Sequence, residues 1–147
     1  LKNNIFVHRD FHVSNLIKYK KQLATIDTQD ALIGNRAYDL ASLIDDVRFK
    51  SNKKFKEQIF NYYIKLNQKK INEDIFQNDF EILSVLRNLK IIGIFTRLAV
   101  RDKKKIYLKL IPYTWKLIEL RIENNKIFYD LKKMLDLNFS KEIRNIK

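Results

Sequence analysis

Residues 8–15 read His-Arg-Asp-Phe-His-Val-Ser-Asn, and a second polar segment begins at Asp27, directly after Ile26. The apolar run Ile5–Val7 ends immediately before the first of these segments. A short apolar run that stops at a cluster of polar residues is typical of a strand that enters a loop. The sequence therefore predicts that residues 8–15 form a polar loop at the end of a strand.

A small hairpin is expected between the two polar segments. Two apolar runs, Leu16–Tyr19 and Leu23–Ile26, flank the polar residues 20–22. Short runs separated by a few polar residues are typical of two paired strands joined by a turn. Because the hairpin folds the chain back on itself, we expect Asn15 and Asp27 to lie close together.

The residue types in these two segments suit phosphoryl transfer. That reaction needs a carboxylate that accepts or orients the proton of the attacking hydroxyl, and Asp10 of the predicted loop is a candidate for this group. It also needs hard oxygen ligands for Mg²⁺, which prefers carboxylate, amide, water and phosphate oxygens. Asn15 and Asp27 would supply two of these ligands.

From Ala37 onward the apolar residues recur at helical spacing. Helices are expected over residues 37–47, 55–66, 80–100, 107–120 and 127–137. The second of these has a predicted apolar face formed by Phe55, Ile59, Tyr62, Tyr63 and Leu66. Pro112 should kink or interrupt the fourth, because proline lacks the backbone donor of a helix interior. The predicted fold class is α+β and mostly helical, with a short hairpin near the N-terminus.

The composition fits one folded domain. The chain has 147 residues, of which 46% are hydrophobic, so it can bury a core. It has no cysteine, which excludes disulfides and thiolate metal sites. Neither a secretory segment nor a long uncharged apolar segment is visible, so a cytoplasmic location without a membrane partner is expected.

The formal net charge of +13 raises the alternative of a helical nucleic-acid-binding module. The Lys and Arg residues are scattered along the chain rather than clustered, which favours a solvated basic surface. Base stacking would also require exposed aromatic rings. Most aromatic residues at helical spacing are expected in the core, namely Phe55, Tyr62, Tyr63, Phe80 and Phe95. A nucleic-acid partner is therefore disfavoured.

The pattern His-Arg-Asp-x-x-x-x-Asn, followed by an apolar residue and Asp27, resembles the catalytic and metal-binding loops of kinases. The continuation from Asp27 through Gly34 to Leu43 is similar to the aminoglycoside phosphotransferase-like superfamily. Within it, the chain most resembles the bacterial cell-wall amino-sugar kinases, which phosphorylate the anomeric hydroxyl of N-acetylmuramate and N-acetylglucosamine. The stretches 87–102 and 107–115 are also similar to that group, and the resemblance extends to about Arg121.

The resemblance implies a protein-kinase-like C-terminal lobe that uses ATP and Mg²⁺. Asp10 would be the catalytic base, and Asn15 and Asp27 would be the metal ligands. Retention of all three disfavours a pseudokinase. The implied reaction moves the γ-phosphoryl group of ATP to a hydroxyl of a small molecule.

Three further residues are implied to support the 8–15 loop. Asp39 matches a family aspartate that braces the loop, although a carboxylate near the start of a helix could equally complement the helix dipole. His8 and Arg9 would support the loop rather than touch phosphate. For His8, hydrogen bonds to the backbone are expected to satisfy the side chain.

Substrate-binding roles are implied for four residues near the predicted site: His12, Gln29, Asp30 and Arg36. His12 replaces the lysine of serine/threonine kinases, and the distance from Asp27 to the next helix leaves no room for a long activation segment. A small acceptor therefore fits better than a protein. The amino sugar is the first expectation, and an aminoglycoside, choline or another sugar is the alternative. In the helical region 52–120, the polar residues Arg87, Asn88, Arg97 and Arg101 could contact the acceptor or serve the fold.

The chain is expected to be part of a longer protein. It begins with Leu1, and no Gly-rich phosphate loop or paired Lys and helical Glu precedes His8. We expect the N-terminal lobe to be missing, so the fragment alone should be inactive. The expected subdivision places the loop, hairpin and metal-binding loop in residues 1–36 and a helical subdomain in residues 37–147.

Overall fold

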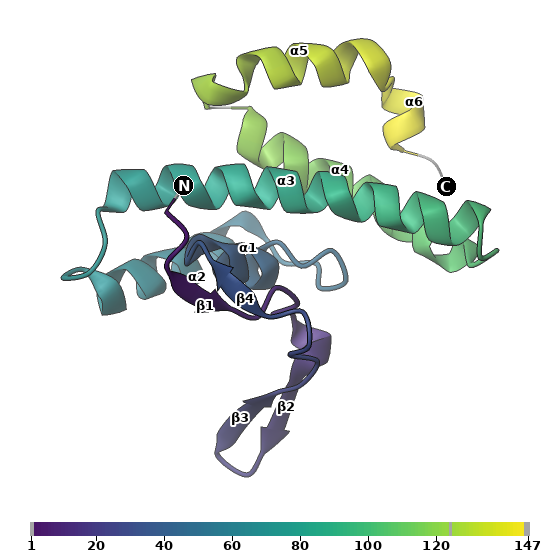
Figure 1. The fold of residues 1–147 in the computed structure, drawn as a ribbon. Helices are drawn as coiled ribbons and strands as arrows, with labels where there is room; N and C mark the ends of the chain where they lie inside the picture. The colour runs from purple at the N-terminus through teal and green to yellow at the C-terminus, as the bar shows by residue number, and fades with distance from the viewer. Residues whose placement is uncertain (1, 124, 146–147) are drawn as a thin grey trace. The chain divides into compact units, whose positions relative to one another are not determined.

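The computed structural model describes residues 2–123 and 125–145 and is mostly helical with two small sheets (Figure 1). The strands are β1 (Ile5–Val7), β2 (Leu16–Tyr19), β3 (Gln22–Thr25) and β4 (Leu32–Gly34). The α-helices are α1 (Ala37–Ile44), α2 (Lys53–Asn67), α3 (Glu73–Val100), α4 (Ile111–Ile122), α5 (Tyr129–Asn138) and α6 (Lys141–Arg144). Short 3-10 helices are η1 (Val13–Asn15), η2 (Lys105–Leu110) and η3 (Lys126–Phe128). The predicted α+β, mostly helical fold class is confirmed.

Strand β1 pairs with β4, a strand that the sequence analysis did not predict. The pairing is antiparallel and sets Ile5 opposite Gly34 and Val7 opposite Leu32. A side chain at Gly34 would place its Cβ 2.7 Å from Cγ2 of Val7, closer than real Cβ contacts. Glycine therefore permits the close pairing on which the start of the 8–15 loop rests.

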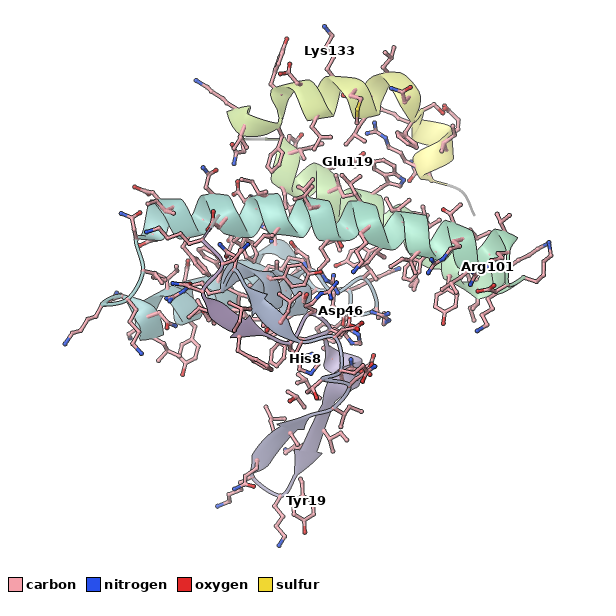
Figure 2. The ribbon with its side chains drawn as sticks, in the orientation of Figure 1. His8, Tyr19, Asp46, Arg101, Glu119 and Lys133 are labelled. Carbon is pink, nitrogen blue, oxygen red and sulfur yellow. The ribbon has the colours of Figure 1, made fainter. Side chains whose placement is uncertain are left out.

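The predicted hairpin is confirmed as β2 and β3. The register pairs Leu16 with Thr25 and Tyr19 with Gln22, which leaves a two-residue connection. Its first residue, Lys20, has a φ of 53°, the left-handed conformation that tight hairpin turns require. Figure 1 shows this hairpin projecting away from the β1–β4 pair, and Figure 2 shows Tyr19 near its tip.

Contacts group the chain into two compact units, Leu1–Ser84 and Val85–Lys147. The boundary falls within α3. In the first unit, the core consists of buried apolar residues from α1, α2 and the first half of α3: Ala37, Leu40, Ala41, Ile44, Ile64, Phe76, Phe80 and Leu83. Phe60 packs against Phe76 and Phe80, with ring centroids 5.8 and 5.0 Å apart. The expected subdivision after residue 36 stays a prediction.

The buried face of α2 differs from the predicted one. Phe55, Tyr62 and Leu66 are 43%, 64% and 64% exposed. The helix instead turns Lys56 and Ile64 fully inward. The side chains of Ile59, Phe60 and Tyr63 pack against the core from the same face. The predicted face was therefore rotated by about one residue, and the expectation that Phe55 and Tyr62 are core residues was wrong.

Two helix starts have clear local causes. Helix α3 begins at Glu73, seven residues before the expected start at Phe80, and the side chain of Asn72 accepts a hydrogen bond from Ile75 N at 3.0 Å. Pro112 lies in the first turn of α4, where a missing backbone donor costs nothing. The expected helix over 107–120 is therefore interrupted, as predicted, and its first part is the 3-10 helix η2.

The buried apolar residues of the second unit include Phe95, Trp115, Leu117 and Ile118. Trp115 packs against Phe139 with ring centroids 5.3 Å apart. Across residues 2–123 and 125–145, no helix has the length and apolar character that crossing a membrane requires.

Candidate active site

Asp10, the predicted base, lies half-buried in the loop between β1 and η1. Its carbonyl oxygen accepts two hydrogen bonds, from His12 N and from Asn15 Nδ2, both at 3.0 Å. These bonds close the loop around Asp10 and fix its backbone. Asp10 is therefore held by the chain around it while its side chain keeps partial contact with solvent.

Asp39, in the first turn of α1, binds the beginning of the same loop. Its carboxylate accepts hydrogen bonds from His8 N at 2.7 Å and from Arg9 N at 3.0 Å. Arg9 has a φ of 71°, a left-handed conformation that costs a non-glycine residue about 1 kcal/mol or more. Hydrogen bonds from consecutive backbone N–H groups to one carboxylate can offset that cost.

The hairpin brings the ends of the predicted metal-binding segments together. Ile26 N donates to the carbonyl oxygen of Asn15 at 3.1 Å, one step beyond the pair of Leu16 and Thr25. Asp27 follows directly, is exposed and has a φ of 69°. The backbone around Asp27 is thus attached to the backbone around Asn15.

These residues fit Mg²⁺ by the chemistry of their donor atoms. Asn15 uses its amide nitrogen toward Asp10, so its amide oxygen is the end suited to a cation, and Asp27 supplies a carboxylate. Within the described part of the chain, no group of three or more His, Cys, Asp or Glu residues could hold a metal ion. Mg²⁺ commonly takes only one or two protein carboxylates and fills its octahedron with water and substrate phosphates.

The four residues with expected substrate roles are not all brought together. His12 is buried within the 8–15 loop, whereas Gln29 and Asp30 are exposed on the segment before β4. The carbonyl oxygen of Asp30 accepts a bond from Arg9 Nη1 at 3.3 Å, which ties that segment to the loop. Arg36 instead donates to the carbonyl oxygen of Lys70 at 3.4 Å. It lines a hollow of about 440 Å³ together with Lys70 and other residues.

His8 is buried, but its ring nitrogens are not satisfied as expected. Among the described residues, neither nitrogen has a hydrogen-bond partner. The ring packs edge-on against Phe11 with centroids 6.0 Å apart. The hydrogen bond of this residue comes from its backbone N–H, which Asp39 accepts. The imidazole therefore serves as packing beneath the loop, which corrects the expectation of a ring satisfied by the backbone.

Two buried acids at the end of α1 were missed by the sequence analysis. Asp46 is 1% exposed and accepts hydrogen bonds from Arg48 N at 2.9 Å and, more weakly, from Val13 N at 3.4 Å. Val13 lies in the 8–15 loop, so Asp46 binds the second half of the loop that Asp39 binds at its start. Figure 2 labels Asp46 and His8 in this region.

The neighbouring Asp45 is fully buried and forms a network with α2 and α3. Lys56 Nζ lies 3.1 Å from Asp45 Oδ1 and donates to the carbonyl oxygen of Ile44 at 2.5 Å. Ser84 Oγ donates to Asp45 Oδ2 at 2.6 Å. A signal for this network exists in the sequence, because Lys56 has apolar residues three, four, seven and eight positions later. A lysine on an apolar helix face requires a buried partner.

The polar residues of the helical region divide by burial. Arg87 and Asn88 of α3 are buried, whereas Arg97 and Arg101 are exposed. All four belong to the second compact unit. Their role toward an acceptor stays a prediction.

The fold and the loop define a class: an α+β, mostly helical chain of the kinase-like type. Residues 1–72 match the phosphotransferase enzyme family. The chain is also similar to an N-acetylmuramate/N-acetylglucosamine kinase of Neisseria meningitidis serogroup B, with 37% identity over 113 residues, 74% of this chain and 34% of that protein. It therefore belongs to the phosphotransferase enzyme family.

Two other relatives bear the same name. The relative from Caulobacter vibrioides is 30% identical over 116 residues, which cover 76% of this chain and 32% of that protein. The relative from Pseudomonas aeruginosa is 31% identical over 137 residues, which cover 89% of this chain and 40% of that protein. The chain thus spans between about a third and two fifths of the length of these curated relatives.

Proposed function

We propose that the intact protein is an ATP-dependent kinase of cell-wall amino sugars, namely N-acetylmuramate and N-acetylglucosamine. The observation that carries the proposal is the arrangement around Asp10. Its backbone is fixed by bonds from His12 and Asn15, and the start of its loop is bound by Asp39. The identity of the proposed acceptors is taken from the names of the relatives, each of which contains both sugars.

The proposed reaction is a transfer of the γ-phosphoryl group to the anomeric hydroxyl. Asp10 orients this hydroxyl and accepts its proton. The hydroxyl oxygen forms a bond to the γ-phosphorus while the bond from that phosphorus to the bridging oxygen breaks, and ADP leaves. A loop held by hydrogen bonds favours this step because the carboxylate loses its conformational freedom on folding rather than during the reaction.

Asn15 and Asp27 would hold Mg²⁺ in the intact protein. The ion would supply charge stabilisation on the phosphate oxygens. The hairpin sets the distance between these two ligands, because it attaches the backbone at Ile26 to that at Asn15. The exposure of Asp27 keeps its carboxylate accessible to a nucleotide.

The hairpin also offers an apolar surface for the base of ATP. Ile17 and Ala24 face each other in the register, and Ile26 follows Ala24 by two positions, which places the three on one face. Ile17 and Ile26 are 47% and 45% exposed, so this face is open to solvent. A planar base could cover these side chains. ATP and the sugar would meet in the cytoplasm, where sugars from cell-wall turnover could be reused.

The test is ATP consumption by the intact protein with N-acetylmuramate, N-acetylglucosamine, an aminoglycoside panel and choline. We expect turnover with the amino sugars, and a loss of about a thousandfold or more in kcat for Asp10→Asn, because the base can no longer accept a proton. Asp74→Asn, an exposed acid in the first turn of α3, is the matched control. Turnover with choline or an aminoglycoside alone would show that the proposed acceptor is wrong. Activity unaffected by Asp10→Asn would refute the proposed mechanism.

A further inference from the structure

A tight turn after α1 presents Arg48 beside the 8–15 loop. Phe49 N donates to the carbonyl oxygen of Asp46 at 3.3 Å, and Arg48 N donates to the Asp46 carboxylate at 2.9 Å. A side-chain acceptor that binds the backbone two residues later is a common way to fix a turn. Because Asp46 is 1% exposed, the turn is attached to the interior.

The same carboxylate connects the turn to the predicted catalytic loop. Asp46 Oδ2 accepts a hydrogen bond from Val13 N at 3.4 Å. Val13 begins the 3-10 helix that ends at Asn15, whose amide binds the carbonyl oxygen of Asp10. The backbone of Arg48 is therefore joined to the loop of the proposed base through a single buried side chain.

The guanidinium of Arg48 lies at the solvent edge of this contact. Its Nη1 is 3.7 Å from Asp46 Oδ1, and the side chain is 39% exposed. A guanidinium has five N–H donors in a planar fork, and this contact engages one terminal nitrogen. The rest of the fork remains able to bind an anion that approaches from solvent.

The other arginines of the first unit are directed elsewhere. Arg9 donates to the carbonyl oxygen of Asp30, and Arg36 donates to that of Lys70. Arg48 is the arginine of this unit that a carboxylate holds next to the 8–15 loop. Among the arginines of this unit, Arg48 is therefore the candidate for contact with an anionic group on an acceptor bound beside this loop.

We propose that Arg48 binds the carboxylate of an acidic sugar acceptor and so makes N-acetylmuramate a better substrate than N-acetylglucosamine. The inference rests on the proposed function. The two sugars differ in that N-acetylmuramate carries a lactyl ether with a carboxylate, whereas N-acetylglucosamine has a neutral hydroxyl there. An arginine fork matches a carboxylate in charge and geometry, and it gives the neutral sugar no comparable contact.

The experiment compares the two sugars in the intact protein. Arg48→Gln should raise KM for N-acetylmuramate about tenfold or more, as the loss of a hydrogen-bonded charge pair implies. The KM for N-acetylglucosamine and both kcat values should stay within about threefold. Arg48→Lys should recover part of the preference because it restores the charge without the fork. Lys54→Gln, which removes an exposed positive charge from α2, is the matched control.

Each outcome decides between distinct roles. An equal loss on both sugars would overturn the inference, since Arg48 would then act on the loop or on a phosphate that both reactions share. An unchanged KM for N-acetylmuramate would also overturn it. If the unmodified protein turns over neither sugar, the proposed function itself fails and the inference falls with it.

Discussion

The two compact units differ in their buried charges, because the first buries two acids and a lysine and the second buries arginines. In the first unit, the acids of α1 and its C-terminal end are turned inward, and Asp39 and Asp46 bind backbone N–H groups of the 8–15 loop. In the second unit, the buried charged residues among those described are two cations, Arg87 and Arg144. Arg144 contacts Glu119 at 3.0 Å and Asp136 at 2.7 Å, and its guanidinium lies 4.9 Å from the Trp115 ring centroid.

The two arrangements have different structural roles: the carboxylates of the first unit fix a loop, and the arginine of the second unit joins helices. A buried carboxylate that accepts backbone N–H groups sets the conformation of the chain that donates them. A guanidinium that contacts half-exposed carboxylates on other segments ties those segments together, but water competes with each contact. We therefore expect substitutions in the first unit to have large effects and those in the second unit to have smaller ones.

The largest expected effect on stability is for Lys56→Ala. Its removal leaves Asp45, which is fully buried, without its cation, and breaking a buried pair on one side costs about 3–5 kcal/mol. The free energy of unfolding from urea titration measures the loss. The double variant Asp45→Asn with Lys56→Met should recover a large part of it, because no uncompensated charge remains. A loss below about 1 kcal/mol for Lys56→Ala would contradict a buried pair.

Asp39→Asn should lower kcat about a hundredfold, equivalent to about 2.7 kcal/mol. Asp39 accepts from His8 N with one carboxylate oxygen and from Arg9 N with the other, and asparagine replaces one of these two acceptors with an NH₂ donor. Steady-state kinetics on the preferred sugar measures the change. Asp74→Asn tests the helix-dipole alternative, because Asp74 also lies in a first helical turn. Equal effects of the two variants would argue against a brace at Asp39.

Arg144→Met should destabilise the protein by about 1–2 kcal/mol. The variant keeps apolar contact with Trp115 but loses contacts to two carboxylates whose side chains are 46% and 43% exposed. Differential scanning calorimetry would detect the lower unfolding temperature. Lys53→Met, which removes a surface pair with Glu57, should change stability by less than about 0.5 kcal/mol. If the two variants are indistinguishable, Arg144 does not join the helices as inferred.

A small acid dependence is expected from Asp136. Hydrogen bonds from Lys132 and then from Arg144 lower the pKa of this carboxyl below its usual value. The ionised group therefore contributes its stability above the unfolded-state pKa of about 4 and loses it as the pH falls through the lower folded-state value. Urea unfolding at pH 7 and pH 3 should show a smaller pH dependence for Asp136→Asn than for the unmodified protein. An identical dependence would rule out a contribution from this pair.

The local parts of the candidate site could be predicted from the sequence. The two short apolar runs Leu16–Tyr19 and Leu23–Ile26 on either side of residues 20–22 were sufficient for the hairpin, and Asp10 and Asn15 lie within one loop. These features depend on near neighbours in the chain. The residue types then indicated a chemistry, and the family match agrees with it.

Contacts between distant segments could not be predicted in the same way. Strand β4 has only three residues and is recognisable by its pairing with β1, since three apolar or small residues alone carry no period. Asp46 became relevant because α1 ends where its carboxylate reaches Val13, and no local pattern encodes that distance. The buried face of α2 was predicted wrongly because Tyr62 and Leu66 were counted as buried apolar residues and Lys56 was counted as an exposed polar one.

The distance between the two proposed metal ligands, Asn15 and Asp27, depends on the β2–β3 hairpin, which is only marginally stable. All of its residues except the half-buried Leu16 are exposed, and a two-stranded hairpin without a core is barely stable in water. Its edges would also invite pairing with other chains, and the lysines at 18, 20 and 21 oppose this by charge repulsion. The lysines of the hairpin thus oppose aggregation, while the hairpin itself is only marginally stable. A group that covers its apolar face would therefore stabilise it and hold Asp27 closer to Asn15.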